Sequence, residues 1–405
     1  MDLTAKRKLK SGTPVWTAYP RHFPRAKRLK RDLETDVLIV GAGISGALIA
    51  YALASDGHRV AVVDRRGPVM GSTPASTALL LFEIDMPLIH LKRKLGARPA
   101  ERAWLRSKAA LDALYQLVCR ERIDAAISLR PSVYLAGDVL DARGLANEAR
   151  ARERLGLPSR YLNRHALRAR FGLSRSAAIV SDSNVAADPR ALASGFLRRA
   201  QQLGARLYAP HEIADIHSRK HSTLAITKDH FTIESRQIVL CTGYEMPKIV
   251  PVEGHSIQST WVIATKPQPK RLWPEECFIW EAATPYLYLR TTIDGRIICG
   301  GEDAEFADTG RRDDLLNEKT KTLEKKLAMM LPKVDPRSQF AWTASFGQSN
   351  TGLPSIGSIP GHSRCYAVLG YGGNGITYSM LAAQLISAAI GGRRDPDARL
   401  FAFRS

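Results

Sequence analysis

The chain of 405 residues is poor in cysteine, in acidic side chains relative to basic ones, and in long apolar runs. Its five cysteines are scattered, form no C-x-x-C pair and do not cluster with histidine. This argues against a disulfide framework and a cysteine-based metal site, so we expect a protein of the reducing cytoplasm with no bound metal. The longest uncharged stretch, 37–54, contains glycines and leads directly into another apolar strand, so we interpret it as folded core rather than a membrane span or signal anchor.

Basic residues outnumber acidic ones, with 59 Lys and Arg against 39 Asp and Glu and a formal net charge of +20. Residues 1–35 hold ten of these basic residues and only three acids. Few aromatic residues accompany them, and no nucleic-acid motif follows. We therefore interpret 1–35 as a solvated basic extension without regular structure and do not expect a nucleic-acid partner, although an arm attracted to RNA is the alternative that this charge leaves open.

Residues 36–64 have the most informative pattern in the chain: a strand, a G-x-G-x-x-G turn, an apolar helix, and a second strand ending in an acid. Gly41 permits the tight bend, Gly43 lets a pyrophosphate approach the backbone, and Gly46 lets the helix pack against the strand. The helix N-terminus attracts the pyrophosphate, and Asp64 is spaced to hold ribose hydroxyls. The pattern predicts a dinucleotide site that contains Gly41, Gly43, Ile44, Ser45, Gly46, Asp64 and Arg65.

The length exceeds what one hydrophobic core usually supports, so we expect two domains. Short strands are expected after Gly204, a buried strand over 237–243, and a hairpin turn at Asp294-Gly295. Apolar periodicity predicts helices over 98–120, 146–171, 189–203, 312–330 and 376–390. The pattern is typical of an α/β protein (α+β, two-domain) in which a Rossmann-like parallel domain is left and re-entered by the chain and carries an inserted antiparallel sheet.

Three later segments resemble signatures of one flavoprotein family. They are the small-residue loop at 71–80, the strand end Cys241-Thr242-Gly243, and the turn Gly370-Tyr-Gly-Gly-Asn-Gly-Ile-Thr377 before an apolar helix. From about residue 36 to 403 the chain resembles the D-amino-acid oxidase, glycine oxidase and sarcosine oxidase family, in particular its γ-glutamylputrescine oxidase-like branch. The resemblance implies FAD in a domain of the glutathione-reductase type. The glycine turn also has a physical logic, since its N–H groups and the following helix dipole stabilise negative charge on a reduced flavin.

The resemblance implies further flavin contacts and an order of domains. The implied contacts are Ser72, Thr73, Thr77, Ala78, Leu79, Ile213, Thr242, Gly243, Gly372, Gly373, Asn374, Gly375, Ile376 and Thr377. Pro74 and the pair Thr77-Ala78 depart from the family's glycines in the loop. No cysteine lies in 343–355, where members with covalent flavin carry theirs, so we expect noncovalent FAD. We expect a basic extension at 1–35, an FAD-binding domain from 36–90, 165–250 and 340–405, and a substrate domain from 91–164 and 251–339.

The resemblance also implies hydride removal from a carbon that bears an amine, with flavin N5 as the acceptor. Arg290 is our candidate to anchor a substrate carboxylate, because a guanidinium grips a carboxylate with two parallel hydrogen bonds. Tyr286, Tyr288 and Arg290 alternate with leucines, so they are expected on one face, with Tyr288 as the second catalytic candidate. Trp261 and Trp280 are either pocket walls or core residues.

Acidic residues follow the loop at 71–80. Glu83 or Asp85 would recognise a cationic amine, with capping of the next helix as the alternative. His255, Glu245 and Asn374 are weaker candidates.

Together these features predict an FAD-dependent amine or amino-acid oxidase or dehydrogenase with oxygen or a quinone as electron acceptor. A 2-hydroxy-acid dehydrogenase on the same fold and an RNA-binding or tRNA-modifying flavoprotein are the alternatives.

Overall fold

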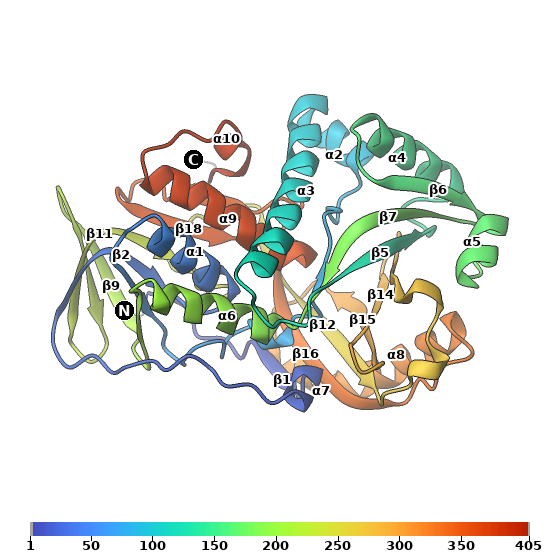
Figure 1. Cartoon of the computed structure of the whole chain (residues 1–405), viewed down its shortest axis with the longest axis horizontal. Coiled ribbons are helices and arrows are strands. Elements are labelled where there is room, and N and C mark those ends of the chain that lie inside the picture. Colours follow the sequence, from blue (N-terminus) through green and yellow to red (C-terminus); the bar gives the residue numbers. More distant parts are fainter. Residues whose placement is uncertain (1–2, 404–405) are drawn as a thin grey trace.

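The computed structural model describes residues 3–403 and has two halves, each built around one large sheet (Figure 1). The left half in Figure 1 contains the parallel strands with α1, α6 and α9, and the right half contains the antiparallel strands with α4, α5 and α8. The long helix α3 stands where the halves meet. This confirms the predicted two-domain α/β architecture with one Rossmann-like half.

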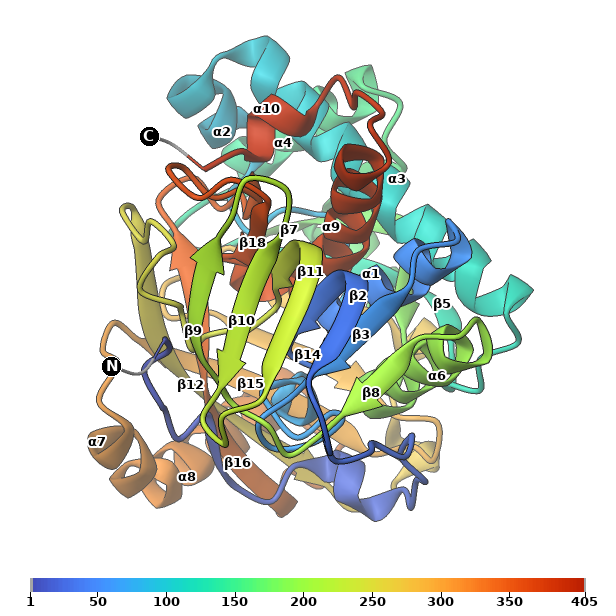
Figure 2. The same ribbon diagram turned by 90° about the vertical axis from the view of Figure 1, so that its left-hand side faces the viewer.

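The first sheet has eight strands in the order β17-β18-β11-β2-β3-β8, with β10 and β9 attached beside β11. Figure 2 shows β9, β10, β11, β2, β3 and β8 as a row of neighbouring strands. Strands β18, β11, β2, β3 and β8 are parallel, as a dinucleotide domain requires. The bounds are β2 (Leu33–Val40), β3 (Val60–Val63), β8 (Arg206–Tyr208), β9 (Ile213–Ser218), β10 (Thr223–Thr227), β11 (Thr232–Leu240), β17 (Ser355–Ser358) and β18 (Cys365–Leu369).

The second sheet has ten strands in the order β1-β16-β12-β15-β14-β13-β5-β7-β4, and β6 pairs with β7. All neighbours are antiparallel except β13 and β5. The predicted hairpin at Asp294-Gly295 is confirmed, since it joins β14 and β15. The bounds are β1 (Lys10–Gly12), β4 (Leu79–Leu80), β5 (Ser128–Leu135), β6 (Ser159–Asn163), β7 (Ala177–Ala186), β12 (His255–Thr265), β13 (Phe278–Glu281), β14 (Leu287–Thr291), β15 (Ile297–Ala304) and β16 (Ser338–Ser349).

The predicted helices form with one exception, and Asp188 caps α6 through the N–H groups of Arg190 and Ala191. The prediction over 146–171 is wrong, because helix α4 ends at Arg154 and β6 intervenes before α5. Gly156 and Pro158 break the arginine-rich pattern there. Within 3–403 none of the helices is both long and apolar enough to cross a membrane. The bounds are α1 (Ile44–Ser55), α2 (Leu88–Leu95), α3 (Ala97–Arg120), α4 (Ala142–Arg154), α5 (Arg164–Phe171), α6 (Pro189–Gln202), α7 (Thr309–Asp314), α8 (Leu316–Met330), α9 (Gly375–Ile390) and α10 (Ala398–Phe401).

The two sheets do not follow the expected domain boundaries at 165 and 340. Strand β7 falls within the expected FAD segment 165–250, yet it pairs with β5 and β6 of the antiparallel sheet. Most of β16 lies in the segment from 340 onward, yet it pairs with β12 along almost its whole length. Apolar strands of this kind show no sequence signal for the sheet that they join, because the long-range partner decides it.

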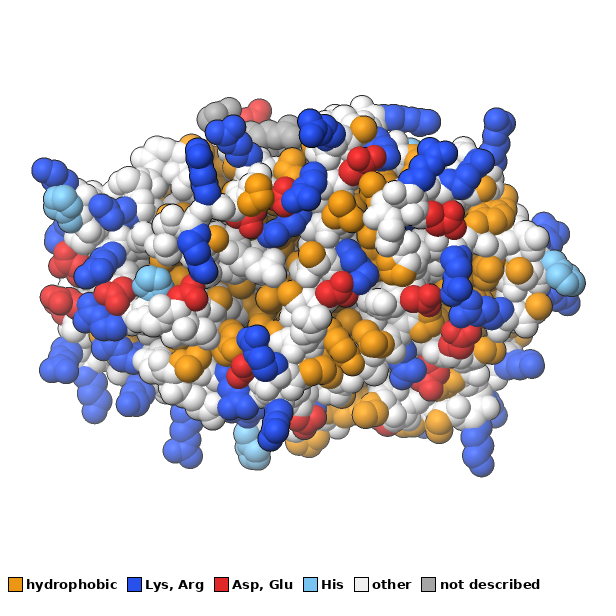
Figure 3. Space-filling model, turned by 45° about the horizontal axis from the view of Figure 1, so that its top comes forward, with side chains coloured by type: hydrophobic (Ala, Val, Ile, Leu, Met, Phe, Trp, Pro, Cys, Tyr) orange, Lys and Arg blue, Asp and Glu red, His pale blue; other side chains and the backbone are white. Residues whose placement is uncertain are grey.

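The N-terminal extension is not the unstructured arm predicted for residues 1–35; its first two residues lie outside the described part. Strand β1 pairs with β16, and Trp16 in the short 3-10 helix Val15–Ala18 is only 3% exposed. Several of its basic side chains form ion pairs with acids elsewhere, namely Lys6 with Glu212, Lys8 with Asp313 and Arg21 with Asp188. Over the face shown in Figure 3, Lys and Arg side chains are scattered with acidic ones between them. That face offers no continuous basic surface for RNA.

Candidate active site

One long cavity runs between the two sheets. It extends from Arg65 and Ile213 beside the parallel strands, past the N-terminus of α1, to Thr377 on α9 and Tyr288 on β14 of the antiparallel sheet. Its lining includes every predicted cofactor residue except Gly46. The structure therefore brings together segments of the chain that are more than 300 residues apart.

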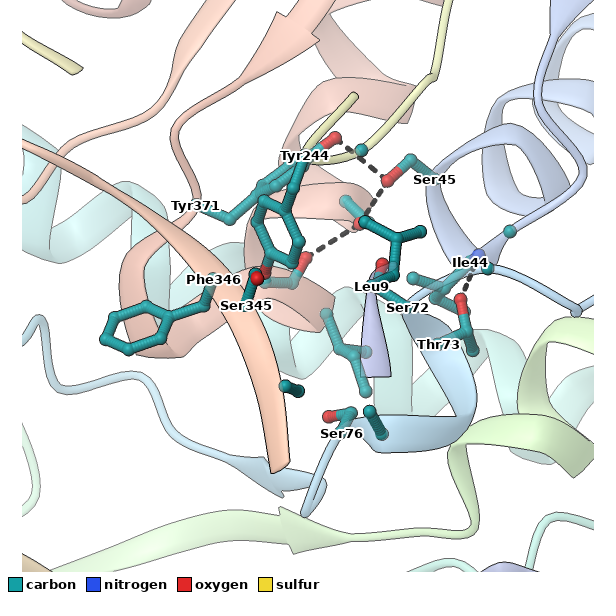
Figure 4. Close-up of a pocket in the computed structure, with 18 of the residues that line it drawn as sticks. Leu9, Ile44, Ser45, Ser72, Thr73, Ser76, Tyr244, Ser345, Phe346 and Tyr371 are labelled. Carbon is teal, nitrogen blue, oxygen red and sulfur yellow. Dashed lines mark hydrogen bonds between the residues drawn. The ribbon is translucent and has the colours of Figure 1, made fainter. Parts of the chain in front are cut away.

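The first glycine turn is shaped by close backbone approaches. Gly41 has a φ of +112°, and a side chain there would overlap the carbonyl of Cys241, the residue that follows β11. A methyl group at Gly46 would overlap the carbonyl oxygen of Gly41, which explains why Gly46 lies behind the cavity wall rather than in it. Helix α1 starts without a side-chain cap, and its first N–H group, at Ile44, meets the Thr73 hydroxyl at 3.1 Å (Figure 4). Such an uncapped N-terminus is suited to an anionic ligand.

The acid after β3 is fixed by backbone donors. The carboxylate of Asp64 accepts hydrogen bonds from the N–H groups of Ala42, Arg66 and Gly67, at 2.7–2.9 Å. These bonds hold it at the cavity wall, close to where Ile213 enters from β9. Arg65 lines the same end and forms an ion pair with Glu245, so Glu245 belongs to this end and not to a substrate pocket.

The loop at 71–80 is held by side chains that donate to its carbonyl groups from distant elements. The indole N–H of Trp16 reaches the carbonyl of Ser76 at 2.7 Å, and that of Trp342 reaches Ala75 at 2.9 Å. Arg290 supplies a third set of donors. Ala78 has a φ of +55°, an unusual backbone conformation for an alanine. The loop therefore depends on tertiary donors to keep its shape.

The C-terminal glycine turn is tied to residues 81–85. The Gly373 N–H donates to Asp85 at 2.7 Å, the Asn374 amide donates to the carbonyl of Glu83 at 2.6 Å, and the Thr377 hydroxyl donates to that of Leu81 at 2.9 Å. A Cβ at Gly372 or Gly373 would lie 2.7–2.9 Å from the Asp85 carboxylate. Asp85 therefore braces this turn and does not cap α2, whose first N–H groups bond to Glu148 instead.

The N-terminal extension closes one side of the cavity. We call residues 3–12 the strap. Its backbone bonds to Lys248 and Glu245 at one end and to Ser345 on β16 at the other. Leu9 of the strap is 7% exposed and lies among the lining residues in Figure 4. No pattern in residues 3–12 predicts that this segment covers the cavity.

Replacing Leu9 by Ser is expected to weaken cofactor retention about tenfold, because roughly 1.5–3 kcal/mol of apolar burial over the cavity would be lost. The measurement is the release of bound cofactor on dilution, followed by its fluorescence. Val252→Ser, at a side chain that is 46% exposed, is the matched control and should release cofactor like the parent protein. Equal release by both variants would contradict a sealing role for the strap.

Arg290 is not in the cavity, contrary to its expected role as carboxylate anchor. Its side chain is 4% exposed and donates to the carbonyls of Thr77, Ala78 and Ala187, at 2.6–3.2 Å. Burial and nearby Arg130 lower the pKa of Arg290 to about 10, so it stays charged at neutral pH. Of the three residues expected on one face, Tyr286 and Tyr288 line the cavity. Arg290 does not, because its side chain lies beneath the loop at 71–80.

Of the remaining candidate site residues, one lines the cavity and three do not. Trp280 lines the cavity, whereas Trp261 is core and donates to the carbonyl of Arg312 at 3.1 Å. His255 packs behind Gly370 and does not line the cavity. Glu83 is fully buried beside Ser132 and does not line it either.

Asp303 lines the cavity and is not among the residues that the sequence pattern predicts for the site. It follows Glu302, which has a φ of +58°, at an irregularity where Ser259 and Trp261 of β12 face Ala304 and Gly301 of β15. The extra residue of such a bulge re-aims the side chain beside it. Because a bulge has no pattern in the sequence, alternation along β15 could not reveal that Asp303 faces the cavity.

Comparison with known proteins agrees with this geometry. The model of the DAO family, described as FAD dependent oxidoreductase, matches residues 36–389. The chain belongs to this family. It is 25% identical over 380 residues to the glycine oxidase of Geobacillus kaustophilus (strain HTA426), covering 87% of this chain and 92% of that one. The crystal structure of glycine oxidase from Geobacillus kaustophilus has the same fold, with a TM-score of 0.74 at 20% identity over 92% of this chain and 99% of that one.

Another relative is longer than this chain. The chain is 24% identical over 274 residues to the Bacillus subtilis (strain 168) protein YhfW, which is named for a Rieske 2Fe-2S iron-sulfur centre. The match covers 67% of this chain and 52% of that protein, so the chain spans about half the length of this relative.

As a DAO-family protein, the chain is an FAD-dependent oxidoreductase. The cavity fits this cofactor, since uncapped helix amides, a ribose-spaced acid and a glycine turn before α9 lie along one continuous wall. The close approach at Gly41 leaves no room for a side chain in the turn below the pyrophosphate. Bound FAD would thus lie between the strap and the two glycine turns.

Proposed function

We propose that this protein oxidises the C–N bond of an amine or amino acid, as a member of the γ-glutamylputrescine oxidase-like branch of the family. The observation that supports this most is the end of the cavity next to Gly372–Thr377. There the wall passes from the cofactor residues to a chamber lined by Asp85, Thr260, Trp280, Tyr286, Tyr288 and Asp303. A chamber of aromatic and polar side chains beside a flavin is what a small substrate needs.

When bound, FAD would supply at flavin N5 a two-electron acceptor for the hydride on the carbon next to nitrogen, and water would hydrolyse the resulting iminium product after its release. The protein holds the reacting carbon in place and keeps water out. Tyr288 lies between Thr77 of the flavin loop and Thr260 of the antiparallel sheet, and burial raises its pKa. Its hydroxyl is therefore neutral and available to orient the substrate.

Noncovalent FAD is part of the proposal. Among the described residues, Cys241 is the cysteine that lines the cavity. Burial raises the pKa of its thiol, so it stays protonated and is a poor nucleophile toward the flavin. Denaturation in acid is expected to release all of the yellow colour from the protein. Colour that stays with the precipitated chain would contradict this part.

The proposal is tested by anaerobic bleaching of the bound flavin with a panel of amines, amino acids and 2-hydroxy acids. We expect amines or amino acids to bleach the flavin and hydroxy acids to leave it oxidised. Bleaching by hydroxy acids alone would favour the hydroxy-acid dehydrogenase, and a protein that takes up no FAD would contradict both enzymes. Adding oxygen or a soluble quinone to the reduced protein then identifies the electron acceptor.

A further inference from the structure

The chamber at the flavin end of the cavity is lined by acidic side chains. Its two ionisable carboxyl groups, Asp85 and Asp303, come from different segments of the chain. The cationic side chains that line the described cavity, Arg65 and Arg66, and the nearby His211 lie at the opposite end, with Ile213. The guanidinium that was expected in the chamber, Arg290, is occupied under the flavin loop. Among the described residues, the chamber is therefore lined by acidic side chains and by no cationic side chain that could pair with a carboxylate.

Several polar atoms of this chamber lack a hydrogen-bond partner. Both carboxylate oxygens of Asp303, the Thr260 hydroxyl and the Trp280 indole N–H are buried and unpaired. Thr260 and Tyr286 lie close enough to Asp303 to lower its pKa, but neither reaches it in hydrogen-bond geometry. Buried polar atoms are rarely left unpaired in folded proteins. The two Asp303 oxygens need hydrogen-bond donors from a ligand, the Trp280 N–H needs an acceptor, and the Thr260 hydroxyl can serve as either.

Backbone geometry directs Asp303 toward this end. At the irregularity of β15, Glu302 turns to Lys319 and Lys326 on α8, and Asp303 turns to the cavity. A residue with positive φ other than glycine costs free energy and is often found at functional sites. The strained backbone at Glu302 thus directs the carboxylate of Asp303 toward the flavin end of the cavity.

Asp85 stands at a second opening of the chamber. Besides the cofactor cavity, it lines an outer cavity with Met86, His90, Ser256, Glu305 and Gln348. The Asp85 residue is exposed by its solvent-accessible surface, while the surrounding protein desolvates its carboxylate and raises its pKa. An elongated molecule in the outer cavity would pass Asp85 on its way to Asp303.

We propose that the substrate is an aliphatic amine without a carboxylate on the reacting carbon, with Asp303 receiving its ammonium group and Asp85 lining its path from the outer cavity. This deepens the proposed function and rests on it. An α-carboxylate in the chamber would face two carboxyl groups without a cation, and burying such an unpaired charge is costly. An ammonium group supplies the donors that the unpaired oxygens of Asp303 need. Hydride transfer requires the neutral amine, and Asp303 is the carboxylate placed to receive the proton.

The pH dependence follows from the surroundings of Asp303. Burial, together with the nearby carboxylates of Asp85 and Glu302, raises the pKa of Asp303 to about 6 against the opposing effect of the Thr260 and Tyr286 hydroxyls. Tyr288 also faces this group and stays neutral. Asp303 is thus protonated below about pH 6 and charged above it. Because only the charged form attracts an ammonium group, kcat/KM for an amine is expected to rise with pH through about 6.

The first experiment compares matched substrates on the FAD-loaded protein under anaerobic conditions. Butylamine is paired with norvaline, and 1,4-diaminobutane with ornithine, so that each pair differs by one α-carboxylate. We expect each amine to bleach the flavin at least about a hundredfold faster than either enantiomer of its amino acid, a difference of about 2.7 kcal/mol. Faster bleaching by the amino acids would overturn the inference and leave the proposed function standing. Bleaching by neither class, with normal reduction by dithionite, would overturn both.

The second experiment replaces Asp303 by Asn, which keeps the size and removes the charge. We expect kcat/KM for butylamine to fall about a hundredfold and its rise near pH 6 to disappear, with FAD content unchanged. Asp308→Asn, five residues along the same segment, is the control, since asparagine caps α7 as well as aspartate. A variant that keeps both its kcat/KM and its pH profile would overturn the role of Asp303. Melting temperature and FAD content separate this result from misfolding.

Discussion

Replacing Gly46 by Val is expected to give a protein that purifies without yellow colour and whose FAD affinity has fallen more than about a hundredfold. The added Cβ would lie 1.9 Å from the carbonyl oxygen of Gly41, which is backbone and cannot move aside as a side chain can. The helix α1 would have to shift away from β2, and such overpacking costs typically 1–3 kcal/mol in stability. The larger effect is on the cofactor, because the shift moves the uncapped α1 amides away from the pyrophosphate position. Titration with FAD, followed by quenching of its fluorescence, measures the loss.

The control for Gly46→Val lies on the same helix. Ala52→Gly lowers the helix propensity of α1 and is expected to cost about 1 kcal/mol in stability. It leaves the turn untouched and should therefore retain FAD like the parent protein. If Ala52→Gly lost FAD to the same extent, general weakening of the helix would explain both results and the steric argument would fail.

The sequence predicted the cofactor half of the molecule well because its determinants are local. Gly46 and Asp64 act within one strand-helix-strand unit, so their spacing already contains the geometry, whereas the close approach of Gly41 to the carbonyl of Cys241 is not local. The hairpin at Asp294-Gly295 and the start of the helix at residue 189 are local in the same sense, and both are confirmed. The turn at 372–375 could be recognised as a segment, but its bracing by Asp85 could not, because that contact spans 288 residues.

The substrate half was harder to predict because non-local contacts decide it. Strand alternation places Arg290 on a face with Tyr288, yet the length of the arginine side chain lets it reach the carbonyls of the flavin loop. Asp303 depends on a backbone irregularity that leaves no pattern in the sequence. The sequence predicts a solvated arm over residues 1–35 because the charge of this segment is visible in the sequence, whereas the pairing of β1 with β16 is not.

Replacing Arg290 by Leu is expected to lower the free energy of unfolding by at least about 3 kcal/mol and to release FAD. The substitution removes the donors to the carbonyls of Thr77, Ala78, Ala187 and Thr291. Each buried carbonyl left unpaired costs about 1–3 kcal/mol. The flavin loop would then lose the donor group that holds Ala78 at its positive φ. Denaturant unfolding measures the stability, and absorbance of bound flavin measures the cofactor.

The control for Arg290→Leu is Arg170→Leu, which removes a partly exposed ion pair with Glu275 and should cost less than about 1 kcal/mol. Arg290→Lys keeps the charge but offers one nitrogen in place of the fork, so its stability should fall between the parent and the leucine variant. With FAD restored by excess cofactor, KM should change in the same proportion for substrates with and without a carboxylate. An intact, yellow Arg290→Leu protein whose KM rises for carboxylate substrates alone would show instead that Arg290 reaches the chamber during turnover, because only a direct contact selects for that group.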